Sequence, residues 1–181
     1  MRGAWKALWA VAAVAVAALG WGYWHAATHG ALDVQVHDLA LKNDGQAYGR
    51  VSRAELAFID AAGTVLASGS AGEPYGMVSI RHPAIGDCRR EEREAFASPQ
   101  AMENWRQCFE TQSRWLVTWV PRARYASVDL GKCRIDKVPL SLEQSKEDWW
   151  LWWVPHPHIG GAPYTYFKLT LRIDSGTCRA A

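Results

Sequence analysis

The chain has 181 residues, of which 49% are hydrophobic, with 20 Lys and Arg against 18 Asp and Glu. Its first 27 residues hold Arg2, Lys6 and no acidic residue, so the remainder carries 18 basic and 18 acidic side chains. A formally neutral domain lacks the basic surface that nucleic-acid binding requires, and about 150 residues suffice for one hydrophobic core. The composition therefore predicts one folded domain and excludes nucleic acid as a partner.

Residues 1–27 are expected to form a membrane signal-anchor. Arg2 and Lys6 precede an uncharged apolar run at residues 7–19, which continues through residue 24. Basic residues before an apolar run favour a cytoplasmic N-terminus and export of the chain beyond the run. As a helix, residues 5–24 reach about 30 Å, the thickness of the hydrocarbon core. Aromatic residues flank the run at both ends: Trp5, Trp9, Trp21, Tyr23 and Trp24.

A cleaved signal peptide is the alternative. The apolar run has the ordinary length of a signal sequence, and Ala18-Leu19-Gly20 offers small residues for a peptidase. Two aromatic belts favour the anchor, because indole and phenol rings prefer both membrane interfaces. We therefore expect a single-pass inner-membrane protein whose residues 28–181 fold in the periplasm or another extracytoplasmic space.

All four cysteines, Cys88, Cys108, Cys133 and Cys178, fall in the exported part. An even number of cysteines in an oxidising compartment predicts two disulfides, whose connectivity the sequence leaves open. We favour Cys88–Cys108, which closes a local excursion, and Cys133–Cys178, which fixes the C-terminus.

Strand patterns begin after a short linker at residues 25–30. Leu32, Val34 and Val36 alternate with polar residues, and residues 43–45 (Asn-Asp-Gly) suit a turn. A hairpin is predicted from alternating residues 53–58, a turn at residues 60–63 and a strand at 64–67. A further short strand is expected at residues 77–81.

A helical insertion is predicted at about residues 88–113. Residues 88–94 are charged and favour a helix, and Ser98-Pro99 supplies a cap followed by proline in the first turn. Ala101, Met102, Trp105 and Cys108 then recur at helical spacing, which places Cys108 within reach of Cys88.

Strands are expected to resume at residues 115–120 and 125–130, with a brief helical turn at 141–144. The last strand is the clearest, because five residues face one way and polar residues the other: Thr165, Phe167, Leu169, Leu171 and Ile173. About eight such strands predict a mainly β fold, an antiparallel β-sandwich with an immunoglobulin-like layout.

The tryptophan run is the first candidate interaction surface. Trp149, Leu151 and Trp153 would share one face of a strand, and Trp150 and Trp152 the other. Both faces cannot meet one core, so one set is expected to contact the inserted helix or a partner protein. The alternative is a stacking platform for glycans or quaternary amines.

His156 and His158, in the proline-flanked loop 155–163, are the second candidate. Two histidines one residue apart suit copper or zinc, but the flanking prolines favour an extended backbone on which the imidazoles need not converge. A rigid interaction loop is the favoured interpretation, with His156 and His158 only weak candidates for a metal site.

No catalytic motif is found in the sequence. Ser68-Gly-Ser-Ala-Gly72 departs from the G-x-S-x-G elbow at its first residue, and neither a phosphate loop nor H-E-x-x-H occurs. We therefore expect a non-enzymatic envelope protein without a cofactor, an accessory subunit of a membrane complex with a protein partner. The alternative is a secreted or tethered module that binds a glycan, a quaternary amine or copper.

Overall fold

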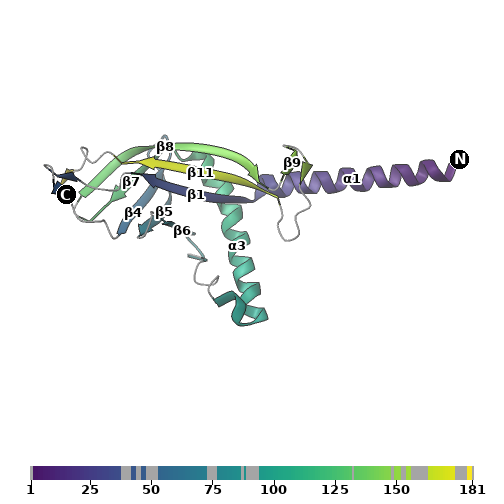
Figure 1. Ribbon diagram of the computed structural model, residues 1–181, viewed down its shortest axis with the longest axis horizontal. Helices are drawn as coiled ribbons and strands as arrows, with labels where there is room; N and C mark the ends of the chain where they lie inside the picture. The colour runs from purple at the N-terminus through teal and green to yellow at the C-terminus, as the bar shows by residue number, and fades with distance from the viewer. Residues whose placement is uncertain are drawn as a thin grey trace.

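The computed structural model describes most of the chain, and the described residues are 2–37, 42–43, 46–47, 53–72, 77–86, 88, 94–131, 133–147, 149–151, 154–155, 163–173 and 179–180. A long N-terminal helix leads into a curved β sheet, from which a second long helix projects (Figure 1). Among the described residues the helices are α1 (Arg2–Thr28) and α3 (Pro99–Trp119), with 3-10 turns η1 (Ala95–Ala97) and η2 (Val120–Arg122).

The main sheet is a mixed sheet that is nearly closed into a barrel. Among the described strands its order is β1-β11-β8-β7-β4-β5-β6, with β12 paired to β8. These strands are β1 (Gly30–His37), β4 (Arg53–Ile59), β5 (Val65–Gly72), β6 (Met77–Arg81), β7 (Tyr125–Asp129), β8 (Cys133–Glu147), β11 (Tyr164–Arg172) and β12 (Arg179–Ala180). Two short hairpins lie outside the sheet, formed by β2 (Lys42–Asn43) with β3 (Gln46–Ala47) and by β9 (Trp149–Leu151) with β10 (Val154–Pro155).

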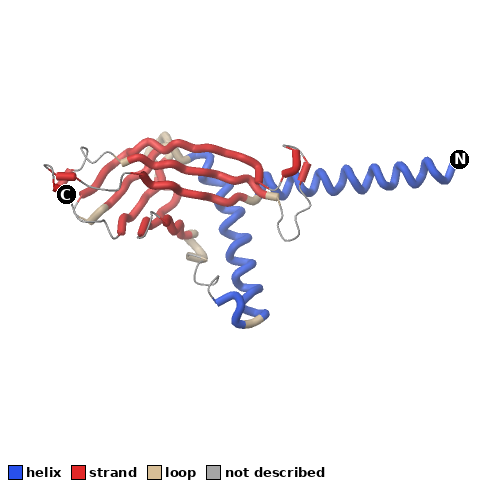
Figure 2. Tube along the Cα trace, in the orientation of Figure 1, coloured by secondary structure: helices blue, strands red, loops and turns tan. Residues whose placement is uncertain are grey.

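A mainly β fold is confirmed, but the immunoglobulin-like sandwich is not. The described strands of the core follow one continuous path rather than two facing sheets, and Figure 2 shows them curving together. The expectation of purely antiparallel pairing is wrong for one pair, because β1 and β11 run parallel, with Gly30 beside Thr165 and His37 beside Arg172. Both strands start beside the end of α1 and run away from it, a relation between distant segments that no local pattern encodes.

The core fills the inside of the curved sheet. On β11 every second residue is buried, as predicted, and Phe167, Leu169 and Leu171 are at most 2% exposed. Phe58 from β4 packs against Trp119 from α3, with their ring centroids 5.3 Å apart and their planes tilted by 42°. The C-terminal half of α3 therefore completes the core that the sheet alone leaves open.

Helix α3 continues through the segment predicted as a strand at residues 115–120, so that prediction is wrong. Ser113, Leu116 and Trp119 are buried at three-residue spacing, which is the period of a helix and not of a strand. The helix begins where predicted, since the Ser98 hydroxyl accepts a hydrogen bond from Ala101 N–H at 3.1 Å. It ends just before Pro121, whose ring is incompatible with a continuing helix.

Two smaller expectations are also corrected. Residues 141–144 belong to β8 and pair with β11, so they form no helical turn. The linker expected at residues 25–30 is not a linker: α1 stays helical to Thr28 and β1 begins at Gly30. The hairpin of β4 and β5 and the strand at residues 77–81 are confirmed.

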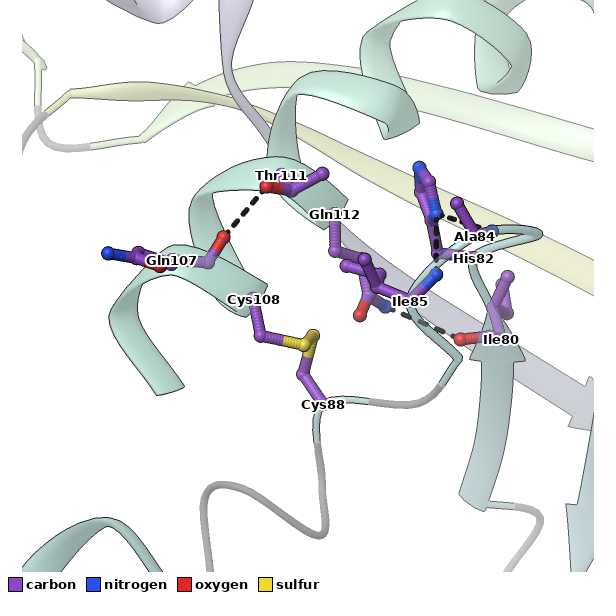
Figure 3. Close-up of a disulfide and its surroundings, with 9 residues drawn as sticks. All are labelled: Ile80, His82, Ala84, Ile85, Cys88, Gln107, Cys108, Thr111 and Gln112. Carbon is purple, nitrogen blue, oxygen red and sulfur yellow. Dashed lines mark hydrogen bonds between the residues drawn. A yellow bond between two sulfur atoms is a disulfide. The ribbon is translucent and has the colours of Figure 1, made fainter. Parts of the chain in front are cut away.

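The disulfide Cys88–Cys108 forms as predicted and ties the chain after β6 to α3 (Figure 3). Cys133 is also disulfide-bonded, and its expected partner Cys178 lies outside the described residues.

Candidate functional site at the base of the N-terminal helix

The end of α1 is joined to the domain by a network of hydrogen bonds, which we call the α1 junction (residues His25, Ala26, Thr28, His29 and Gly30). The His29 N–H donates to the carbonyl of His25 at 2.9 Å, and the His29 carbonyl accepts from Thr165 N–H at 2.9 Å. The Thr165 hydroxyl donates to the carbonyl of Ala26, which is 1% exposed. The helix therefore passes directly into β1 while also being bonded to β11.

Two stacked imidazoles lie in the α1 junction. The ring centroids of His25 and His29 are 3.9 Å apart and the rings are nearly parallel, with an interplanar angle of 1°. Nδ1 of His25 lies 3.0 Å from the carbonyl oxygen of Pro163, which connects α1 to the start of β11. Nε2 of His29 accepts a hydrogen bond from Nε of Arg114 at 3.0 Å, which connects the helix end to α3.

These contacts assign the neutral tautomer of His29. Because Nε2 accepts from a guanidinium, the ring proton sits on Nδ1, which lies 3.0 Å from the carbonyl of His25 and 3.0 Å from the Thr28 hydroxyl. Burial lowers the pKa of His29, the hydrogen bond to His25 opposes this, and charge on His25 and Arg114 lowers the pKa further. Protonation would place two donors, Nε2–H and the Arg114 Nε–H, against each other.

Gly30 is the point of closest approach in the α1 junction. Its N–H donates to the Ser113 hydroxyl at 3.0 Å, and that hydroxyl donates to the Gly30 carbonyl at 2.8 Å. A Cβ at Gly30 would lie 2.8 Å from the Phe167 ring and 2.9 Å from a Val117 methyl. Only glycine lets β1 approach α3 and β11 this closely.

A cavity of about 230 Å³ lies beside the α1 junction, between α1, the end of α3, β8 and β11. Its wall includes Tyr23 and Ala27 from α1 and Gln144 and Lys146 from β8. The Lys146 ammonium lies 4.7 Å from the centroid of the Tyr23 ring, in a cation–π contact.

The tryptophan run lies partly outside the described residues. The backbone of β9, which contains Trp149 and Trp150, pairs with β10 in a short hairpin. This hairpin lies against α1, close to the point where the helix meets the sheet (Figure 1). Trp152, Trp153, His156 and His158 lie outside the described residues, as do the side chains of Trp149 and Trp150. The structure thus places the β9–β10 hairpin beside α1, and the two predicted faces of the run stay untested.

A second cavity, of about 260 Å³, lies where the curved sheet fails to close, between β1, β6 and α3. Gln112 of α3 donates to the carbonyl of Ile80 in β6 at 3.4 Å, while its neighbour Ser113 bonds to β1. Figure 3 shows Gln112 reaching the strand end beside the disulfide. Adjacent residues of one helix therefore bridge the two open edges of the sheet.

Two aspartates outside the α1 junction make local hydrogen bonds within the sheet and its turns. Asp129 accepts from Gly131 N–H at 2.7 Å, and Asp136 accepts from the Ser127 hydroxyl at 2.8 Å. Within the described part of the chain, no group of three His, Cys, Asp or Glu side chains is placed to hold a metal ion.

The α1 junction was missed by sequence reasoning. His25 and His29 stand four residues apart, a spacing that places them on one helical face. That signal was present, but interpreting residues 25–30 as a linker removed the helix on which it depends.

Comparison with protein-family models, curated proteins and solved structures finds no significant match for this chain.

Proposed function

We propose that this protein is a non-enzymatic, single-pass membrane protein that holds its β domain against the outer face of the membrane as an accessory subunit of a larger complex. In this proposal α1 crosses the membrane with its N-terminus in the cytoplasm, and the sheet with α3 lies in the periplasm or an equivalent space.

The observation on which the proposal depends is the character of α1. Residues Ala4–Thr28 form one helix whose most apolar stretch of 18 residues has a mean hydropathy of 1.6, and its large side chains are exposed. Trp9 and Trp21 are 69% and 58% exposed. An isolated helix that exposes this much apolar surface to water is unfavourable, whereas a bilayer would cover it.

The α1 junction supports the same proposal. Because α1 enters β1 without a flexible linker, the domain would be held close to the bilayer in a fixed orientation. The hairpin of β9 and β10 then lies near the membrane surface, where tryptophan is favoured. The disulfide Cys88–Cys108 agrees with folding in an oxidising compartment.

The membrane topology can be tested in a bacterial host with the full chain tagged at its C-terminus. We expect the protein to remain in the membrane after carbonate extraction, and the C-terminal tag to be digested by protease in spheroplasts but not in intact cells. Intact mass before and after reduction and alkylation would report an uncleaved N-terminus and disulfide-bonded cysteines. Recovery of the domain in the cytosol with four alkylatable thiols would contradict the proposal.

Association with a partner can be tested by pull-down from detergent-solubilised membranes of the native source. Ala10, Ala13, Ala17 and Gly20 share one face of α1, and small residues let transmembrane helices approach closely. We expect Ala13→Leu to weaken recovery of the partner. Ala15→Leu, the same change on the opposite face, is the matched control. Recovery of the wild-type protein only as a free monomer would contradict the role as a subunit.

A further inference from the structure

The residues of β8 that lie on the core side of the sheet change from apolar to polar as the strand approaches α1. In the pairing of β8 with β11, Leu142 lies beside Leu169, Gln144 beside Phe167 and Lys146 beside Thr165. Phe167 and Leu169 are core residues, so Gln144 and Lys146 stand on the same side of the sheet as the core. Leu142 packs against the core, whereas Gln144 and Lys146 are exposed, so the core ends at Leu142 and the polar residues beyond it face an open space.

Gln144 and Lys146 both line the cavity of about 230 Å³ beside the α1 junction. Among the described residues of its wall, Lys146 is the only charged side chain. Lys168 and Glu143 lie 3.9 Å apart on the same sheet, and neither lines the cavity. The cavity therefore presents a positive charge, and Gln144 adds amide donors.

The cavity lies beside the C-terminal end of α1. Tyr23 contributes to its wall and lies between Trp21 and Trp24, in the last turns of the apolar helix. The ring of Tyr23 also contacts Lys146. Tyrosine, tryptophan and lysine at the end of a span are typical of the headgroup region.

We infer that this cavity binds the phosphate of an anionic lipid headgroup, held by Lys146 with help from Gln144 and Tyr23. The inference rests on the proposed membrane insertion of α1, because only that places the cavity at headgroup depth. A lysine ammonium is a point charge suited to phosphate, and anionic lipid attracts basic residues at the membrane surface. Bound lipid would also fill the space between α1 and the sheet.

The test is native mass spectrometry of the full chain in detergent, titrated with phosphatidylglycerol or with phosphatidylcholine. We expect the wild-type protein to retain phosphatidylglycerol in preference to phosphatidylcholine. Lys146→Gln should reduce this retention about fivefold, which is the change in affinity expected from removing one lysine near an anionic surface. Lys168→Gln, a change on the same sheet away from the cavity, is the matched control and should retain the lipid as the wild type does. Equal thermal unfolding of both variants would show that folding is intact.

The outcomes separate the two proposals. If α1 is not membrane-integrated by carbonate extraction, the proposed function fails and this inference fails with it. If the protein is integrated but Lys146→Gln retains phosphatidylglycerol like the wild type, the lipid site alone is wrong. Displacement of the lipid by inorganic phosphate at millimolar concentration would identify a site for free anions and overturn the lipid assignment.

Discussion

The imidazole of His29 is the buried ionisable group on which the attachment of α1 depends most directly. It is 4% exposed, accepts from Arg114 at Nε2 and packs against His25. The titratable and charged groups that act on it are His25 from α1 and Arg114 and Glu110 from α3. A second proton on this ring would remove the acceptor that Arg114 uses.

The stability of the domain is therefore expected to fall in mild acid. Burial lowers the pKa of His29 in the folded state, so the unfolded chain binds the proton more readily. The contribution of neutral His29 is complete above about pH 6.5, the ordinary histidine pKa, and is lost as the pH falls below it. Thermal unfolding between about pH 7.5 and pH 5 should show a decrease in Tm that His29→Gln reduces. An identical decrease in wild type and variant would contradict this role.

A second prediction at the residue scale concerns Gly30. Gly30→Ala would place a methyl group within 3 Å of the Phe167 ring and a Val117 methyl, and 3.1 Å from the Thr165 carbonyl oxygen. Overpacking of this kind costs about 1–3 kcal/mol, because the neighbours must shift. Urea unfolding should show the loss directly. Gly20→Ala, where a Cβ meets nothing within 4 Å, is the control and should leave the stability of the domain unchanged.

At the scale of elements, α3 both completes the core and extends beyond it. Its C-terminal half contributes Leu116 and Trp119 to the core, while its N-terminal half runs away from the sheet (Figure 2). Phe109, on the projecting half, is 52% exposed. The disulfide Cys88–Cys108 is the covalent link between this half and the sheet.

Removing that disulfide is expected to destabilise the protein. Cys88 and Cys108 are 20 residues apart in sequence. Closing a loop of this size lowers the entropy of the unfolded chain and so stabilises the folded state by about 2–4 kcal/mol. The double variant Cys88→Ser/Cys108→Ser should show this loss in urea unfolding under non-reducing conditions. The variant leaves Cys133 unchanged, so it isolates the contribution of one bridge. An unchanged midpoint would show that packing alone holds α3 in place.

Elements with a single consistent signal could be predicted from the sequence. The hairpin of β4 and β5 follows from alternation and from Asp60, whose carboxylate accepts from the Ala62 and Thr64 N–H groups at 2.9 Å. The strand β11 follows from its alternation, and the start of α3 from Ser98. In each case the local pattern and the tertiary environment demand the same conformation.

Elements whose residue spacing fits both a strand and a helix could not be predicted from the sequence. Trp115, Val117 and Trp119 alternate as in a strand, while Leu116, Trp119 and Val120 recur as in a helix. Packing against Phe58 decides in favour of the helix. The parallel pairing of β1 with β11 depends on residues more than 130 positions apart, as does the bond from Thr165 to Ala26. The candidate site at the α1 junction arises from these distant contacts, so the sequence predicted the helix but not its attachment.

On the scale of the whole molecule, α1 consists of two parts with different surroundings. Its last turns contribute to the domain through the buried Ala26 and through Tyr23, which lines the cavity with Lys146. Its earlier turns extend away from the sheet in Figure 1, and their large side chains are exposed. Only the last turns are therefore expected to affect the stability of the domain.

Two truncations separate these parts. A chain that begins at residue 21 keeps the α1 junction, whereas a chain that begins at residue 30 loses Ala26, His29 and their bonds to Thr165 and Arg114. Several lost hydrogen bonds around buried groups should lower the free energy of unfolding by about 2–4 kcal/mol in the shorter chain relative to the longer one. Refolded domains compared by urea unfolding would measure the difference, with the full chain in detergent as the reference. Equal urea midpoints for the two truncations would mean that only the covalent chain, and not the hydrogen bonds of the α1 junction, attaches α1 to the domain. The rigid placement of the domain against the bilayer would then lose its structural basis.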